Sequence, residues 1–217
     1  MSIHPFITFL QKRLQKTLPG ESAQKAMAPT PLNTYFTMRM DPTADAHPSS
    51  VLVPLYTDEH QNLKIIFTLR TKTIRHAGQI SFPGGRSEND EKPVETALRE
   101  SHEEIDLSPK SVQVLGQITP LYLYRTNNQI TPFVGYVDKE PILQRNPEEV
   151  EEIITVSMED LVKSENKIRE TWELEHATFD VPYWNIHSTP LWGATAMITG
   201  ELIEIYLEFK DGKKPNR

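Results

Sequence analysis

Three glutamates fall within five residues near the end of a segment whose pattern predicts a helix over 93–105. Each residue of an α-helix turns by about 100°, so positions three and four apart share a face. We therefore expect Glu100, Glu103 and Glu104 to form a cluster of carboxylates. Like charges at this spacing repel one another, and a divalent cation would offset the repulsion. Such a cluster can hold Mg²⁺ or Mn²⁺ and leave positions open for water and phosphate oxygens.

The elements around these glutamates also have local signals. Gly84 and Gly85 precede the helix, and paired glycines let the backbone approach a ligand closely. We expect Asp90 to cap the helix and Pro93 to lie in its first turn. A neighbouring helix face is expected to pack on a sheet, and its residues are Val94, Ala97, Leu98, Ser101 and Ile105.

The full spacing resembles the Nudix box, G-x(5)-E-x(7)-R-E-U-x-E-E-x-G-U, in which U is a bulky aliphatic residue. The matching positions are Gly85, Glu91, Arg99, Glu100, Glu103, Glu104 and Leu107. Six fixed positions coincide by chance about once in 10⁷ to 10⁸ starts. Ser101 replaces an aliphatic residue, and we expect its hydroxyl to bond to the helix backbone. Asp106 replaces a glycine, and Asp tolerates left-handed conformations better than most residues.

Resemblance to the Nudix hydrolases implies a role for each position. The metal ligands would be the three box glutamates (Glu100, Glu103 and Glu104) and the Gly85 carbonyl, with the glutamates also catalytic. Glu91 and Arg99 would complete the catalytic set as an ion pair that fixes the loop to the helix. From the residues alone, Arg99 can instead pair with Glu95 or Glu103. Glu91 can instead be an exposed acid that complements the helix dipole.

An upstream segment resembles the extra motif of coenzyme A (CoA) diphosphatases within the Nudix group, roughly L-L-T-x-R-[SA]-x(3)-R-x(3)-G-x(3)-F-P-G-G. The matching residue types are Thr68, Arg70, Arg75, Gly78, Phe82, Pro83, Gly84 and Gly85. Thr71 stands in place of Ser or Ala, and two residues rather than three separate Arg75 from Gly78. The resemblance implies that substrate is bound by Arg70, Arg75, Phe82, Gly84 and Gly85. Arginine suits this role because it binds phosphate in a bidentate manner, and CoA carries a 3′-phosphate besides its diphosphate.

Further acidic and aromatic residues lie downstream. Glu149, Glu151 and Glu152 stand at the start of a predicted strand, and some Nudix enzymes take their general base from a downstream loop. A box glutamate can also be the base, and the downstream acids can simply form a solvated strand edge. The three tryptophans are expected in the core, and they are Trp172, Trp184 and Trp192.

Composition limits the class of protein. The 217 residues include 23 Lys plus Arg and 30 Asp plus Glu, a net charge of −7, which argues against nucleic-acid partners. The absence of Cys excludes disulfides and thiolate metal sites. No apolar run approaches the ~18 to 20 residues of a membrane span, so we expect a soluble, cytoplasmic protein without a membrane partner. The acid-free segment 1–20 predicts an amphipathic helix rather than a transit peptide.

The pattern of elements predicts an α/β (α+β) protein, with a mixed β-sheet sandwiched between α-helices as in the Nudix fold. Strands are expected over 50–56, 63–69, 112–119, 130–137, 150–156, 168–173 and 178–184, and further helices over 158–163 and 191–207. The expected divisions are an N-terminal helix and connector (1–31), a Nudix hydrolase domain (32–210) and a tail (211–217).

The resemblance implies metal-dependent hydrolysis of CoA or an acyl-CoA to 3′,5′-ADP and (acyl-)4′-phosphopantetheine, with Mg²⁺ or Mn²⁺. One alternative is a Nudix hydrolase of ADP-ribose, dinucleotides or nucleoside triphosphates. Another is a catalytically silent module that binds a nucleotide. The expected partner is a small nucleotide diphosphate, and a homodimer is left open.

Overall fold

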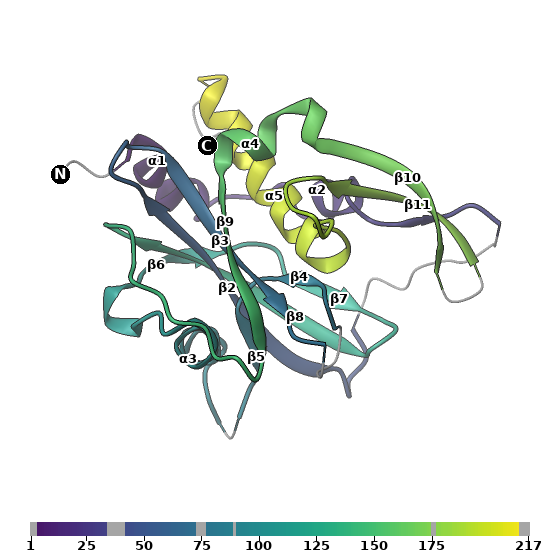
Figure 1. Ribbon diagram of the computed structural model, residues 1–217, viewed down its shortest axis with the longest axis horizontal. Helices are drawn as coiled ribbons and strands as arrows, with labels where there is room; N and C mark the ends of the chain where they lie inside the picture. Colours follow the sequence, from purple (N-terminus) through teal and green to yellow (C-terminus); the bar gives the residue numbers. More distant parts are fainter. Residues whose placement is uncertain (1–3, 34–41, 73–76, 89, 175–176, 213–217) are drawn as a thin grey trace.

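A mixed β-sheet forms the centre of the computed structural model, which describes residues 4–33, 42–72, 77–88, 90–174 and 177–212 (Figure 1). Its strands are β2 (His47–Thr57), β3 (Leu63–Arg70), β4 (Ile80–Ser81), β5 (Gly84–Arg86), β6 (Gln113–Gln117), β7 (Leu121–Leu123), β8 (Asn128–Val137) and β9 (Val150–Ser157). The main order is β4-β3-β2-β8-β6, with β5 beside β2, β7 beside β8 and β9 beside β3. Strands β2 and β8 are parallel and the other described pairings are antiparallel, so the predicted mixed sheet is confirmed.

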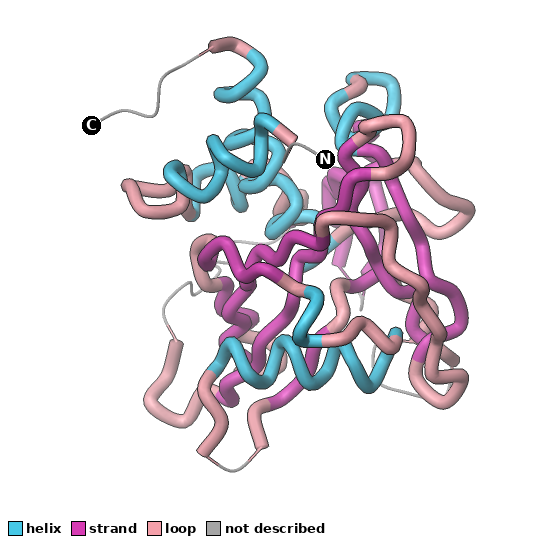
Figure 2. Tube along the Cα trace, turned by 90° about the vertical axis from the view of Figure 1, so that its left-hand side faces the viewer, coloured by secondary structure: helices cyan, strands magenta, loops and turns pink. Residues whose placement is uncertain are grey.

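Helices cover both faces of this sheet (Figure 2). The helices are α1 (Pro5–Arg13), α2 (Glu21–Lys25), α3 (Pro93–Ile105), α4 (Met158–Val162) and α5 (Gly193–Lys210), with 3₁₀ turns η1 (Pro109–Ser111) and η2 (Ser164–Asn166). Alternate residues of a strand point to opposite faces. Accordingly Leu52 packs in one core with Ala97 of α3, whereas Val53 packs in the other with Leu202 of α5. The sandwich predicted from the sequence is therefore present.

A smaller sheet stands apart from the central one and is built on a hairpin. It consists of β1 (Thr30–Pro31), β11 (Ala177–Trp184) and β10 (Lys167–Leu174), in that order. The hairpin pairs Lys167 with Trp184 at its base and Leu174 with Ala177 near its tip, so the strands expected over 168–173 and 178–184 are both present. Figure 1 shows the hairpin extending away from α5, over the side of the central sheet that carries β4 and β7.

Helix α3 has the bounds that the sequence predicts, but a different cap. Lys92, not Asp90, is the N-cap residue. Its backbone N–H donates to the Glu95 carboxylate at 3.0 Å, so a side chain inside the first turn satisfies this amide and no acid is needed at position 90. At the other end Asp106 is left-handed, with φ of 56°, and the Ser101 hydroxyl donates to the Ala97 carbonyl at 2.7 Å. Both expectations for these substituted positions are confirmed.

Two other segments differ from the sequence prediction. The final helix begins at Gly193 rather than Leu191, because Leu191 forms an isolated bridge with Trp184 through two backbone hydrogen bonds of 3.0 and 3.1 Å. The helix then continues to Lys210, three residues beyond the predicted end. The predicted connector after the first helix contains α2 and β1. No helix in the described ranges is long and apolar enough to cross a membrane.

A fully buried carboxylate joins the N-terminal segment to the rest of the fold. Glu201 of α5 accepts hydrogen bonds from the Gly20 N–H at 3.0 Å, Gln24 Nε2 at 3.0 Å and Thr119 Oγ1 at 2.6 Å. Phe6 of α1 lies in the same core as the central sheet. The division of the chain at residue 31 stays a prediction, but the two parts share one core.

Candidate active site

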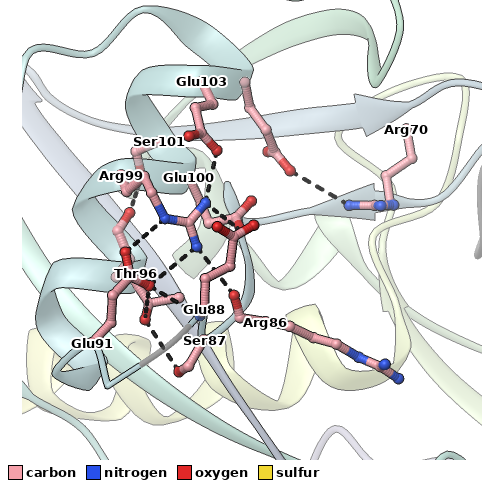
Figure 3. Close-up of polar contacts among 12 residues, drawn as sticks. Arg70, Arg86, Ser87, Glu88, Glu91, Thr96, Arg99, Glu100, Ser101 and Glu103 are labelled. Carbon is pink, nitrogen blue, oxygen red and sulfur yellow. Dashed lines mark hydrogen bonds and ion pairs between the residues drawn. The ribbon is translucent and has the colours of Figure 1, made fainter.

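Arg99 lies at the centre of a polar network between helix α3 and the loop before it (Figure 3). Its Nε donates to Glu91 Oε1 at 2.7 Å, so the predicted ion pair is confirmed. Its Nη1 lies 2.7 Å from Glu103 Oε2 and 3.0 Å from Glu100 Oε1. Its Nη2 donates to the Arg86 carbonyl at 3.1 Å. One guanidinium thus holds the loop and two of the three box glutamates, and the alternative pair with Glu103 forms as well.

Glu91 is the anchor of the loop. Its Oε2 accepts hydrogen bonds from the Glu88 N–H at 3.2 Å and from Thr96 Oγ1 at 2.9 Å, in addition to those from Arg99. The hydrogen bond from Arg99 is the main reason that the pKa of Glu91 falls to about 2. Glu91 therefore stays ionised at neutral pH and serves as a fixed partner for Arg99.

The three box glutamates share helix α3 but not one environment. The side chain of Glu104 is 2% exposed, that of Glu100 15% and that of Glu103 52%. Within the described residues, no group of three His, Asp or Glu side chains converges as in a formed metal site. The reason is visible in Figure 3, where Glu103 turns towards Arg99. The assignment of all three as metal ligands stays a prediction.

Gly84 and Gly85 are required by close packing. A Cβ atom on Gly84, whose φ is 156°, would lie against the Ser50 carbonyl and 2.6 Å from the Val51 Cα. A Cβ on Gly85 would overlap the carboxyl group of Glu100. The absence of a side chain brings the Gly85 backbone against a box glutamate, and the expected close approach to a ligand stays a prediction.

Glu104 combines burial with an unsatisfied oxygen. Burial raises its pKa to about 8, although the Arg70 charge lowers it; the charges of Glu100 and Glu149 raise it further. The nearest Arg70 nitrogen is 3.7 Å from Glu104 Oε1. Glu104 Oε2 is buried and has no hydrogen-bond partner in the described part of the chain. Burial also raises the pKa of Glu100. A divalent cation fits this donor set, because hard cations bind carboxylate oxygens and would relieve the buried charge.

The downstream glutamates take separate positions. Glu149 is held beside Arg70, because its carbonyl accepts from the Thr71 N–H at 2.9 Å, and its charge acts on both Glu100 and Glu104. Glu152 instead lies 3.3 Å from His187 Nε2. Glu151 is exposed. Of the three downstream candidates for the general base, Glu149 is the one whose charge acts on the box glutamates.

A large cleft opens beside these residues, with a volume of about 1380 Å³. It is lined by Arg70, Phe82, Gly84 and Gly85 of the predicted substrate-binding set. The Phe82 ring is 2% exposed and packs against the Phe67 ring with centroids 4.8 Å apart, so it supports the wall from within the core. Arg75 lies outside the described residues.

Several lining residues were not found from the sequence. They are Arg86 of β5, Arg125 and Asn128 around the β7–β8 turn, and Trp192 before α5. Trp184 is buried as expected, but Trp192 is only half-buried and faces the cleft. Neighbouring residues of a strand point to opposite faces of the sheet, so Gly85 and Arg86 face opposite ways. This alternation is the local signal in the sequence that could have pointed to Arg86 as a lining residue.

Comparison with known proteins agrees with this arrangement. The family described as NUDIX domain matches residues 46–177, more than half of the chain. The chain belongs to the Nudix family, and its fold is the Nudix fold.

Three curated relatives illustrate the range of similarity. Nudix hydrolase 3 of Caenorhabditis elegans is 36% identical over 118 residues, which cover 52% of this chain and 49% of the relative. The peroxisomal coenzyme A diphosphatase NUDT7 of Mus musculus is 38% identical over 112 residues (51% and 47%). The mitochondrial coenzyme A diphosphatase NUDT8 of Mus musculus is 34% identical over 142 residues (62% and 67%). The matched region spans about half the length of the first two relatives.

Proposed function

We propose that this protein hydrolyses the diphosphate linkage of CoA or an acyl-CoA, releasing 3′,5′-ADP and 4′-phosphopantetheine or its acyl form. The observation that carries the proposal is the position of the buried glutamates of α3. Glu100 lies against Gly85, and Glu104 accepts a hydrogen bond from the Gly84 backbone, at the edge of a cleft that arginines line. The two relatives named as coenzyme A diphosphatases support the choice of substrate.

The residues divide the chemistry among them. Glu100, Glu103, Glu104 and the Gly85 carbonyl would hold Mg²⁺ or Mn²⁺, which would neutralise phosphate oxygens and lower the pKa of a bound water. Arg70, at the end of β3, would bind the diphosphate, since it already approaches Glu104 from the cleft side. Arg99 and Glu91 act by positioning, because they fix the loop against α3.

Proton transfer is assigned to Glu149. Its charge is coupled to Glu100 and Glu104, and its backbone is fixed by Thr71. A carboxylate at this place can accept a proton from the attacking water. The Glu149→Gln variant should therefore lower kcat and leave KM nearly unchanged, whereas Glu165→Gln, an exposed surface change, should do neither. A rise in KM with kcat unchanged in Glu149→Gln would contradict this role.

Product analysis tests the proposal directly. Purified protein is incubated with CoA in Mg²⁺, in Mn²⁺ and in EDTA, and the products are identified by mass spectrometry. Metal-dependent 3′,5′-ADP is the expected result, and Glu103→Gln and Glu104→Gln should each remove most of it. Near-wild-type rates in both variants would contradict the assigned metal ligands.

Other outcomes identify the alternatives. Cleavage of ADP-ribose, a dinucleotide or a nucleoside triphosphate, with CoA left intact, would keep the diphosphate chemistry and overturn the substrate. Nucleotide binding without metal-dependent turnover would favour a silent binding module. The cytoplasmic location and the homodimer stay predictions, for which fractionation and size-exclusion chromatography are the tests.

A further inference from the structure

The positively charged side chain of Arg86 lines the cleft. Its carbonyl faces Arg99, while Figure 3 shows its side chain pointing away from the box glutamates. Its guanidinium has no hydrogen bond or ion pair with any residue that the structure describes. By contrast, Arg70 approaches Glu104 and Arg99 is fully engaged. Arg86 is exposed and lines the cleft, so it is available to a ligand.

The register of the sheet places a second polar group near Arg86. Arg86 of β5 pairs with Ser49 of β2, and Ser49 pairs with Ile130 of β8. Residues paired across strands, and residues two apart on one strand, point to the same face. Asn128 therefore lies on the same face as Arg86 and also lines the cleft. Its Oδ1 atom is buried and has no hydrogen-bond partner among the described residues.

The charges of the cleft differ in sign from those of the whole chain. The described residues that line it include three arginines, Arg70, Arg86 and Arg125, but one acid, Glu173. The chain as a whole carries a net charge of −7. A cationic cleft in an acidic protein favours a ligand with several negative charges. Arg70 lies beside the box glutamates at the end of β3, whereas Arg86 lies on β5, which pairs with β2, so Arg86 adds a separate cation to the cleft.

We propose that Arg86 binds a phosphate ester on the ribose of the substrate, apart from the diphosphate that is cleaved. Asn128 Oδ1 accepts a hydrogen bond from the adenosine part of the same ligand. This inference rests on the proposed function, because CoA has such a phosphate. Arg86 then determines substrate specificity, since it favours the binding of nucleotides with a ribose phosphate over those without one.

The test compares ligands that differ by this phosphate alone. Binding of adenosine 3′,5′-bisphosphate and of 5′-AMP is measured by calorimetry in EDTA, for wild type, Arg86→Ala, Asn128→Ala and Lys110→Ala. Lys110 is an exposed cation in η1 and serves as the matched control. The wild type should bind the bisphosphate about 10- to 100-fold more tightly, as expected for a hydrogen-bonded charge pair.

The variants should show different signatures. Arg86→Ala should lose this preference and keep its affinity for 5′-AMP within about twofold. Asn128→Ala should weaken both ligands by a similar factor, and Lys110→Ala should match wild type. Thermal unfolding of each variant confirms that it is folded. Equal loss of both ligands in Arg86→Ala would mean that Arg86 binds the phosphate that the two share, and would overturn the proposal. Equal affinities in the wild type would overturn it too.

Kinetics separates this proposal from the proposed function. With CoA and 3′-dephospho-CoA as substrates, Arg86→Ala should raise KM for CoA about 10-fold or more and leave KM for dephospho-CoA unchanged. A wild-type protein that prefers the bisphosphate but cleaves neither substrate would keep the ribose-phosphate site and overturn the CoA diphosphatase assignment. A wild-type protein that cleaves both substrates with equal KM would keep the CoA diphosphatase assignment and overturn the ribose-phosphate site.

Discussion

The buried carboxyl of Glu104 should make the metal-free protein less stable as the pH rises. Burial raises its pKa from 4.5 to about 8. A carboxyl whose pKa is higher in the folded chain binds its proton more tightly there, so protonation favours folding. The stabilisation is fully present below pH 4.5 and is lost progressively as the pH rises to about 8. Glu104→Gln removes this titration and keeps the shape of the side chain.

The magnitude follows from the shift. One pKa unit corresponds to about 1.4 kcal/mol, so a shift from 4.5 to 8 corresponds to about 5 kcal/mol in total. Part of this loss has occurred by pH 5. Between pH 5 and pH 9, the free energy of unfolding of Glu104→Gln should therefore rise by about 4 kcal/mol relative to wild type. Any fixed cost of burying the amide cancels in this double difference.

Urea denaturation in EDTA at pH 5, 7 and 9 measures the effect, with Glu165→Gln as an exposed control. The control should follow wild type at each pH. Adding Mn²⁺ at pH 8 should stabilise wild type more than Glu104→Gln, because the variant would lack the carboxylate proposed to bind the cation. A double difference below about 1 kcal/mol would refute the account of Glu104 as a buried charge that folding must accommodate.

Three further predictions concern the site and its support. Gly85→Ala should lower kcat about 100-fold, measured by product formation, because its Cβ would displace the Glu100 carboxyl group. Glu201→Gln should lower the free energy of unfolding by about 2 kcal/mol in urea, since its amide would face the Gln24 and Thr119 donors. Arg99→Lys should lower kcat, because an ammonium group cannot bind Glu91, Glu100 and Glu103 together.

Local signals explain what the sequence could predict. Helix α3 was placed correctly because Pro93 opens it and the Ser108–Pro109 step follows its end. The Arg99–Glu91 pair was predictable because family resemblance specifies both positions. The N-cap was missed because Glu95, inside the helix, bonds to the Lys92 amide.

The cleft depended on long-range pairing. Asn128 and Arg86 are 42 positions apart and share a face only through the register of β5, β2 and β8. The start of the last helix was wrong because Leu191 pairs with Trp184 across a turn. The same connection leaves Trp192 at the cleft rather than in the core. Neither hydrophobic period nor spacing along the chain contains such information.

The cleft has walls from two sheets that share no strand. One side includes Gly84, Gly85 and Arg86 of the central sheet, and another includes Leu174 and Phe179 of the β10–β11 hairpin. Because the hairpin contributes none of the box residues, its sequence can change over evolutionary time without moving the glutamates of α3. Substitutions in the hairpin can thus reshape one wall of the cleft and leave the carboxylates of α3 in place.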